Sequence, residues 1–370
     1  MKLMTVVGTR PEIIRLSCII PKLDAALGVE GHTFVHTGQN SQRALRDVFF
    51  EEFGLRKPDM MPPSVPFGWP AAFASMLEFV AQCFQTRPPD RVLILGDTNS
   101  ALATAIIATR AGVPIIHLEA GNRCFDLRSP EEGNRRMIDS VATVHLPYTD
   151  RAKGNLLDMG VPRGSIFTIG NPIAEVMGAF DPEDDLDRCY KLGLGGIYGP
   201  YIVATLHRAE TVDNLGKLAG IIHSLCTLRQ QSGLPIALSL HPRTADRLPE
   251  LRGLTCDWKN SLHLLDPPLG FKDWRALAKN AQLVITDSGT VPEEAVIDGV
   301  HSLILRDYTE RQEITECGGQ TLIGSNGVGL VEAARLALAG GPRKVYACPV
   351  GYDNFDVSSA VVAIATGVLP

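Results

Sequence analysis

The sequence predicts an α/β protein of two domains, each with a parallel sheet that helices cover on both faces. Its 370 residues are about twice the length of a typical domain. Short apolar runs rich in Val and Ile alternate with longer helical patterns along the whole chain. Because strands of a parallel sheet are buried on both faces, such apolar runs separated by helices are typical of this fold class.

The candidate strands form two series. The first comprises residues 2–7, 33–36, 91–95, 114–118, 144–146 and 166–169. The second comprises residues 201–206, 236–240, 262–264, 283–286 and 302–305. The helical patterns between them include residues 12–26, 41–53, 73–85 and 214–231. This order predicts two sheets formed one after the other along the chain.

Residues 180–200 separate the two series, and they are first acidic and then rich in glycine. Such a composition is typical of a domain boundary. We therefore predict an N-terminal domain over residues 1–180 and a C-terminal domain over residues 181–350. We expect a tail helix over residues 351–370 to pack back on the N-terminal domain.

Composition excludes several classes of function. The net charge of −6 argues against a nucleic-acid surface, which needs clustered Lys and Arg. Eight cysteines without a C-x-x-C pair indicate reduced thiols in a cytoplasmic protein. No apolar run approaches the roughly 18 residues of a membrane span, and no metal-ligand spacing such as H-E-x-x-H occurs. We expect a cytoplasmic protein that binds no metal and no membrane.

Polar loops follow most of the predicted strands. In the first half they read GTRPE, TGQN, GDTNS and EAGNR, and in the second LHRAE, HPRT and TDSGT. Ligands of open parallel sheets bind outside the carboxyl ends of the strands. The sequence therefore predicts an active site in a cleft between the two domains.

Two of these loops are suited to phosphate. Arg10 lies in a strand–helix turn that offers backbone N–H groups and a guanidinium to an anion. The alternative is an ordinary strand–helix turn with a surface arginine. Ser288 and Gly289 begin a second such turn, in which Ser288 is the expected N-cap and Glu294 could accept from ribose hydroxyls. A simple capping box with acidic first-turn residues is the alternative for this turn.

Three carboxylates suit acid/base chemistry beside an anionic leaving group. Asp97, Glu119 and Glu131 follow strands or lie one loop beyond them, with arginines close by. A solvated loop would explain any one of them, but not all three together. His207 and His241 also follow strands, and we interpret both as ligand contacts.

The ordered motifs closely resemble those of one enzyme family. GTRPE, TGQ, GDT, H-L-E-A-G, PEE-x-NR, LHR-x-E, HP, TDSG-x-x-x-EE and R-D-x-TER occur in that order across residues 8–313. This pattern resembles the non-hydrolysing UDP-N-acetylglucosamine 2-epimerases. The resemblance implies a glycosyltransferase-B-type fold of two Rossmann-like domains, a homodimer, and no dissociable cofactor.

The resemblance also implies a role for each matching residue. Asp97, Glu119 and Glu131 would be the acid/base carboxylates, and His207 would be the partner of the departing diphosphate. The expected substrate contacts are Arg10, Arg15, Arg135, His241, Ser288, Gly289, Thr290, Glu294 and Arg311. UDP would leave C1 as the proton leaves C2, and would add back to the trapped glycal after protonation on the opposite face.

Several residues depart from the family pattern. Arg15 stands in place of a usual lysine, Asn40 in place of a histidine, and Asn122 in place of a leucine. Glu175 stands near the place of an aspartate, and Gln312 replaces a proline. The segment 121–126 is similar to a branch that acts on UDP-2-acetamido-2,6-dideoxy sugars, on the way to UDP-N-acetyl-L-fucosamine. Because Asn40 replaces the histidine of relatives that UDP-N-acetylglucosamine activates, we expect simple hyperbolic kinetics.

Three other functions are compatible with parts of this pattern. A retaining glycosyltransferase of the same fold would use the diphosphate contacts but would not need three carboxylates near C2. A hydrolysing epimerase would release UDP and free N-acetylmannosamine. A non-catalytic nucleotide-sugar sensor would keep the phosphate contacts without the carboxylates.

Overall fold

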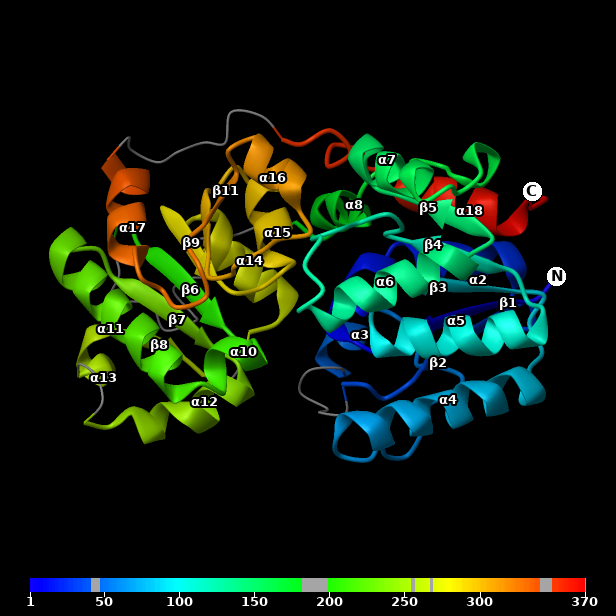
Figure 1. Cartoon of the computed structure of the whole chain (residues 1–370), viewed down its shortest axis with the longest axis horizontal. Coiled ribbons are helices and arrows are strands. Elements are labelled where there is room, and N and C mark those ends of the chain that lie inside the picture. Colours follow the sequence, from blue (N-terminus) through cyan, green and yellow to red (C-terminus); the bar gives the residue numbers. More distant parts are fainter. Residues whose placement is uncertain (41–46, 182–198, 254–256, 267–268, 340–347, 370) are drawn as a thin grey trace. The chain divides into compact units, whose positions relative to one another are not determined.

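The computed structural model describes residues 1–40, 47–181, 199–253, 257–266, 269–339 and 348–369 (Figure 1). The chain divides into two compact units. Unit 1 comprises Met1–Phe180 and Val350–Pro370, and unit 2 comprises Asp181–Pro349. Each unit contains one parallel sheet with helices on both faces, which confirms the predicted fold class.

The sheet of unit 1 has five strands in the order β2-β1-β3-β4-β5. The strands are β1 (Leu3–Val7), β2 (His32–His36), β3 (Arg91–Leu95), β4 (Ile115–Leu118) and β5 (Val144–Leu146), and all pair in parallel. The order reverses between β1 and β3. In open parallel sheets this switch point is where ligands bind, outside the carboxyl ends of the strands.

Two layers of helices cover this sheet. One layer comprises α4 (Trp69–Thr86), α5 (Asn99–Ala111) and α6 (Pro130–Val141), which pack side by side over a core that includes Val6, Val92 and Ile94. The other layer comprises α1 (Arg10–Leu16), α2 (Ile19–Leu27), α8 (Pro172–Ala179) and α18 (Val357–Thr366). The shorter helices α3 (Asp47–Glu52) and α7 (Asp150–Asp158) complete the unit, with a 3₁₀ turn at Arg163–Ser165.

The last helix, α18, returns to unit 1 and packs on α2 and α8. The buried carboxylate of Glu175, on α8, accepts a 2.7 Å hydrogen bond from the Ser358 backbone N–H and another from its hydroxyl. Lys22, on α2, donates to Asp356 at 2.9 Å. Glu175 therefore satisfies a donor at the first turn of α18, where backbone N–H groups have no partner within the helix.

The sheet of unit 2 has six strands in the order β11-β10-β9-β6-β7-β8. The strands are β6 (Ile202–Leu206), β7 (Ile236–Leu240), β8 (His263–Leu265), β9 (Leu283–Thr286), β10 (Ser302–Ile304) and β11 (Gln320–Leu322), all parallel. Alternate residues of β6 enter different cores: Ile202 and Ala204 face one, whereas Val203 faces the other. The order reverses between β6 and β9, which places a second switch point there.

The helices of unit 2 cover both of these cores (Figure 1). They are α10 (Ala209–Val212), α11 (Leu215–Ser232), α12 (Pro242–Arg247), α13 (Trp258–Ser261), α14 (Phe271–Lys279), α15 (Val291–Ile297), α16 (Gln312–Glu316) and α17 (Leu330–Ala339), with a 3₁₀ turn at Leu248–Leu251. The helices α11 and α17 pack together on one face. Trp274 and Leu277 of α14 belong to the core of the other face.

Three sequence expectations about the fold were wrong. The helix expected over residues 12–26 is interrupted at Ser17 and Cys18, because Pro21 has no N–H to donate to the Ser17 carbonyl. Residues 166–169 form no strand and contribute only an isolated bridge between His145 and Ile166. Cys226 is disulfide-bonded, contrary to the expectation of reduced thiols throughout.

Other expectations lie partly outside the described residues. These are the beginning of the helix at residues 41–53 and most of the boundary segment 180–200. Within the part of the chain that the structure describes, no helix is both long enough and apolar enough to cross a membrane.

We expect Glu175→Ala to destabilise unit 1, because it leaves the buried Ser358 N–H and hydroxyl without their acceptor. Loss of such a charged hydrogen-bond acceptor costs about 1–3 kcal/mol of unfolding free energy, measurable by urea denaturation. Glu332→Ala is the matched control, because its carboxylate pairs with Arg335 on an exposed helix face and its loss should cost much less. Equal losses in the two variants would contradict this role of Glu175.

Candidate active site

In unit 1 the loops that follow β1 and β3 are joined by the side chain of Glu12. Its Oε2 atom accepts hydrogen bonds from the N–H groups of Gly8 and Thr9 at 3.0 and 2.8 Å, and from the Thr9 hydroxyl at 2.8 Å. Its Oε1 atom accepts from the Thr98 hydroxyl at 3.0 Å. Glu12 is only 1% exposed, and this burial raises the pKa of its carboxyl to about 7.

The TGQ loop after β2 joins the same cluster. Gln39 accepts from the N–H and hydroxyl of Ser100 at 3.0 and 2.8 Å, and the Thr37 hydroxyl lies 2.6 Å from that of Ser100. The packing leaves no room for a side chain at Gly8, where a Cβ would lie 1.9 Å from the Ser100 Oγ. Three loops therefore interlock at the switch point of this sheet.

Asp97 follows β3 and is held by residues of α6. The Arg135 guanidinium donates to its carboxylate through Nη2 and, at 3.1 Å, through Nε. Asn134 donates to the Asp97 carbonyl at 2.9 Å. Arg135 also donates to the buried Glu132 at 3.1 Å. Arg135, which the resemblance assigns to UDP, is thus bound to one of the expected catalytic carboxylates.

Glu119 follows β4 in a strained conformation. Its φ of +68° lies in the left-handed region, which a residue with a side chain enters at a cost of the order of 1 kcal/mol. Its carboxylate is 7% exposed and lies 3.8 Å from the buried Nε of Arg15. It also lies about 4 Å from the position of a Cβ at Gly96. The structure therefore brings Glu119 beside the loop that carries Asp97.

The third carboxylate, Glu131, lies in the first turn of α6 and accepts from the Ser129 hydroxyl at 2.6 Å. It shares this helix with Arg135. Arg10 begins α1, and its guanidinium lies over the Phe49 ring, 5.7 Å from the ring centre. Arg10 and Glu131 thus lie on the first turns of two helices that follow the polar loops.

In unit 2, His207 follows β6 and Asp287 follows the neighbouring strand β9. The Asp287 carboxylate accepts from the N–H groups of His207 and Arg208 at 3.0 Å, and lies 3.3 Å from the His207 Nδ1. Burial raises the pKa of Asp287 to about 6, against the lowering effect of these two N–H groups. The His241 ring lies 5.6 Å from the His207 ring. The two expected histidine contacts are therefore neighbours, and Asp287 orients one of them.

The TDSGT turn differs from the expectation in one detail. Thr290, not Ser288, is the N-cap residue of α15. Ser288 instead accepts from the N–H groups of Thr290 and Val291 at 3.2 and 3.4 Å, because its hydroxyl folds back over the turn. A Cβ at Gly289 would lie 2.7 Å from the carboxylate of Glu310, so a larger residue there would have to displace that side chain.

Arg311 is buried on unit 2 and pairs with the buried Glu293 at 2.7 Å. Its carbonyl accepts from the side chain of Gln320 at 2.8 Å. Glu294, the next residue of α15, is also buried. These contacts hold Arg311 beside the first turn of α15.

Three buried residues that hold the candidate site residues were not predicted from the sequence. Glu12, Asp287 and Glu293 are each buried and each hold a predicted site residue or its loop. All three lie inside motifs that the sequence identifies, GTRPE and TDSG-x-x-x-EE, so their positions near the site could have been predicted. A sequence does not show which acidic residue of a motif points inward.

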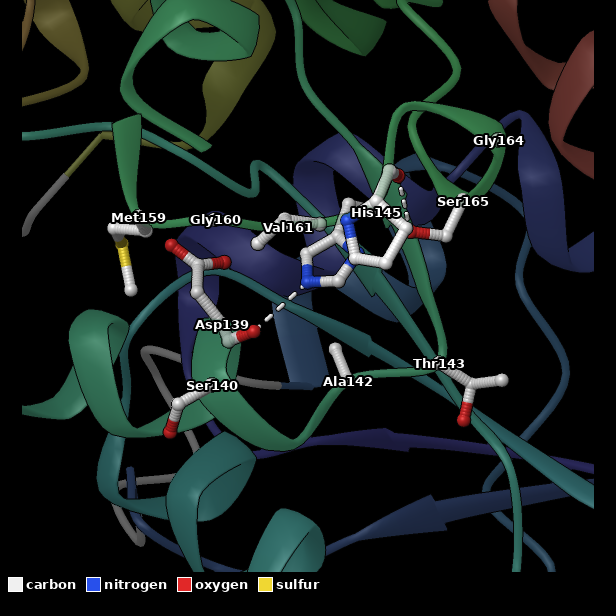
Figure 2. A pocket seen from close by; sticks show the side chains of 11 residues that line it. Asp139, Ser140, Ala142, Thr143, His145, Met159, Gly160, Val161, Gly164 and Ser165 are labelled. Atoms are coloured by element: carbon white, nitrogen blue, oxygen red, sulfur yellow. Dashed lines mark hydrogen bonds between the residues drawn. The ribbon is translucent and has the colours of Figure 1, made fainter. Parts of the chain in front are cut away.

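Figure 2 shows a cavity of about 520 Å³ in unit 1, lined by Asp139, His145, Met159 and Val161 among others. Thr143, which precedes β5, also lines it. The cavity therefore lies near the amino end of β5. Among the described residues there is no group of three or more His, Cys, Asp or Glu that could hold a metal ion.

The fold and these loops define an α/β enzyme of the glycosyltransferase-B type. The family model for UDP-N-acetylglucosamine 2-epimerase matches residues 25–365. The UDP-N-acetylglucosamine 2-epimerase of Methanocaldococcus jannaschii is 35% identical over 344 residues, which cover 91% of this chain and 92% of the relative. The chain belongs to the UDP-N-acetylglucosamine 2-epimerase family, a family of isomerases.

Two further proteins are similar to this chain. The UDP-2,3-diacetamido-2,3-dideoxy-D-glucuronate 2-epimerase of Pseudomonas aeruginosa is 34% identical over 340 residues, covering 91% of this chain and 92% of the relative. The crystal structure of the M. jannaschii enzyme in complex with UDP-GlcNAc and UDP has a TM-score of 0.88 at 33% identity, and the match covers 99% of both chains.

Glu12→Gln should change how stability depends on pH. Since the pKa of Glu12 is about 7 in the folded protein and 4.5 ordinarily, the folded state binds more protons between these values, and the wild-type unfolding free energy falls as pH rises through this window. A glutamine can keep the hydrogen bonds without this proton. We expect the variant to gain up to about 3 kcal/mol relative to wild type at pH 8, at about 1.4 kcal/mol per pKa unit.

The measurement is urea unfolding of both proteins from pH 5 to pH 8. The difference between the two curves isolates Glu12 from other groups, including Asp287, that titrate in the same range. Parallel curves for the two proteins would show that Glu12 is ionised throughout.

Proposed function

We propose that the protein is a non-hydrolysing 2-epimerase of a UDP-N-acetylhexosamine. The observation that carries this proposal is the arrangement of Asp97 and Glu119 at neighbouring strand ends, each beside a buried arginine. A non-catalytic sensor would not need a strained carboxylate at Glu119. A glycosyltransferase breaks the C1–O bond of the sugar but does not need two carboxylates beside C2.

The chemistry requires three events at the sugar. The C1–O bond breaks with its electron pair going to the UDP oxygen, a carboxylate removes the C2 proton, and the C1=C2 double bond of a glycal forms. A proton then returns to C2 on the opposite face, and the UDP oxygen adds back to C1. Since the proton leaves one face and returns to the other, two carboxylates are needed, and Asp97 and Glu119 are the candidates, with Glu131 as a third.

The arginines beside Asp97 and Glu119 favour the ionised form of these carboxylates. A cation within a few Å favours the ionised form of a carboxylate, which is the form that accepts a proton. Arg135 supports Asp97 in this way, and Arg15 supports Glu119. We therefore propose that Arg135 and Arg15 act on the carboxylates as well as on the substrate.

Departure of UDP requires charge stabilisation of a different kind. We propose that His207, oriented by Asp287, stabilises the departing diphosphate, with Arg10, Arg311, His241 and the 288–290 turn as further contacts. Glu294 would accept from ribose hydroxyls. Preorganised donors of this kind are worth several kcal/mol where negative charge develops, because they need no reorganisation during the reaction.

The identity of the sugar rests on one segment of the chain. Residues 121–126 are similar to those of the branch that acts on UDP-2-acetamido-2,6-dideoxy sugars. The two relatives of 35% and 34% identity are named for UDP-N-acetylglucosamine and for a diacetamido-glucuronate sugar. We propose a 6-deoxy sugar of that branch as the preferred substrate. We also propose a cytoplasmic homodimer.

Incubation with three substrates tests the function. Purified protein is mixed with UDP-N-acetylglucosamine, a UDP-2-acetamido-2,6-dideoxyhexose or UDP-2,3-diacetamido-2,3-dideoxyglucuronate, and the configuration at C2 is followed by NMR. We expect inversion at C2 to an equilibrium mixture without stoichiometric release of UDP, fastest for the 6-deoxy sugar. Net release of UDP and free sugar would indicate a hydrolysing enzyme instead.

Substitution of the three carboxylates should lower turnover without weakening UDP binding. We expect Asp97→Asn, Glu119→Gln and Glu131→Gln each to lower kcat by about 10²–10⁴-fold, the usual contribution of an acid/base group, with UDP affinity nearly unchanged by calorimetry. Glu332→Gln is a suitable control, because Glu332 pairs with Arg335 on an exposed helix face of unit 2, outside the candidate site. Near-normal kcat in all three variants would remove these carboxylates from the chemistry.

A further inference from the structure

A buried histidine and a buried aspartate contact the backbone next to Asp97 and next to Glu119. We propose that His117 and Asp139 form a charged positioning pair that fixes the backbone on either side of Asp97 and Glu119. The inference rests on the proposed function, since it assigns a role to residues that support that same chemistry. His117 and Asp139 themselves are out of reach of substrate, because they are 0% and 1% exposed.

The hydrogen bonds of His117 determine its protonation. Its Nε2 lies 2.8 Å from the Gly96 carbonyl oxygen, and its Nδ1 lies 2.8 Å from the Asp139 carboxylate. A carbonyl oxygen only accepts, and an ionised carboxylate only accepts. With Asp139 ionised, both ring nitrogens donate, and the proposed pair is an imidazolium and a carboxylate.

Asp139 is held as a carboxylate from several sides. Besides His117, it accepts from the Gly121 N–H at 3.1 Å and pairs with the Arg123 guanidinium at 2.7 Å. Burial by itself would raise the pKa of Asp139, but the contacts with His117 and Arg123 hold it below its ordinary value. Its backbone carbonyl accepts from His145 at 2.8 Å, the contact drawn in Figure 2.

This pair touches the chain at both catalytic loops. Gly96 immediately precedes Asp97, and Gly121 lies two residues after Glu119, so each contact fixes the backbone next to a carboxylate. Gly121 has a φ of +81°, and a Cβ there would lie 2.2 Å from the Ala152 carbonyl oxygen. The loop is thus confined on one side by α7 and anchored on the other by Asp139.

The arrangement also explains how Glu119 keeps its strained conformation. The residue lies between His117, whose ring is fixed at both nitrogens, and Gly121, whose N–H is fixed by Asp139. A strained residue persists only where the surrounding structure over-determines it. Both anchors depend on the carboxylate of Asp139, which makes it the residue to change.

Asp139→Asn tests the charge without removing the contacts. An asparagine can accept from Gly121 and Arg123 through Oδ1 and donate to the His117 Nδ1 through Nδ2, which leaves the ring neutral. Asp139→Ala removes the contacts altogether. The matched control is His145→Gln, because His145 is also buried but its ring binds the Asp139 backbone carbonyl rather than Gly96 or Gly121.

Two measurements test the pair: the protonation of the His117 ring and the kinetics of the variants. The ¹⁵N shifts of the His117 ring report its protonation at pH 7, and kcat, KM and UDP affinity are measured with the substrate that wild type turns over fastest. We expect a doubly protonated ring in wild type and a neutral ring in Asp139→Asn. We expect kcat of Asp139→Asn to fall about 10-fold with KM and UDP affinity within twofold, because neutral hydrogen bonds hold the two loops less firmly than charged ones, and a misplacement of ~1 Å would cost on the order of 10²-fold in rate.

Asp139→Ala should lower kcat further and speed hydrogen exchange at the Gly121 N–H, whereas His145→Gln should keep wild-type kcat. A neutral His117 ring in wild type, or wild-type kcat in Asp139→Ala with the protein folded, would overturn the proposal. If wild type epimerised none of the three sugars, the proposed function would fail. The ring shifts and the Gly121 exchange would then still decide whether the pair is charged and anchors this loop.

Discussion

Buried carboxylates that accept hydrogen bonds from loop backbone hold the polar edges of both sheets. Glu12 does so in unit 1 by accepting from Gly8 and Thr9, and Asp287 does so in unit 2 by accepting from His207 and Arg208. Placing a carboxylate in the protein interior is costly unless donors satisfy it. If one of these loops moved away, its buried carboxylate would be left without hydrogen-bond donors. This constraint fixes the positions of the residues that the loops carry.

A similar constraint acts on Asp97 and Glu119, which we propose as acid/base groups. Each carboxylate lies beside a buried arginine, and the backbone next to each is tied to the His117–Asp139 pair. Acid/base groups work best when their positions are set before the substrate arrives, since little reorganisation is then left for the reaction. The left-handed backbone of Glu119 is the local cost of that placement.

Much of this architecture could be predicted from the sequence. Continuous apolar runs predicted β7 and β9 with their observed bounds, and the polar residues after each strand identified the loops that carry the candidate site. The break between α1 and α2 follows from Pro21, which a periodicity argument overlooked. The short strand β11 (Gln320–Leu322) has two polar residues out of three and gave no apolar signal.

The supporting residues of the site could not be predicted in the same way. Within unit 1 His117 meets Asp139, and within unit 2 Asp287 meets His207, which lies 80 residues away in the sequence. Their pairing depends on how the strands and helices pack, which a single sequence does not encode locally. The resemblance to a family identified residues expected to touch substrate, and left aside those that hold them in place.

The central claim is that a carboxylate removes the C2 proton while UDP leaves and that a proton returns from the other face. Epimerisation of the preferred substrate in deuterated water, followed by NMR at C2, tests it most directly. The account predicts one solvent deuterium at C2 of every epimerised product molecule. Product that retains its original hydrogen at C2 would contradict the account, because inversion would then have occurred without loss of that proton.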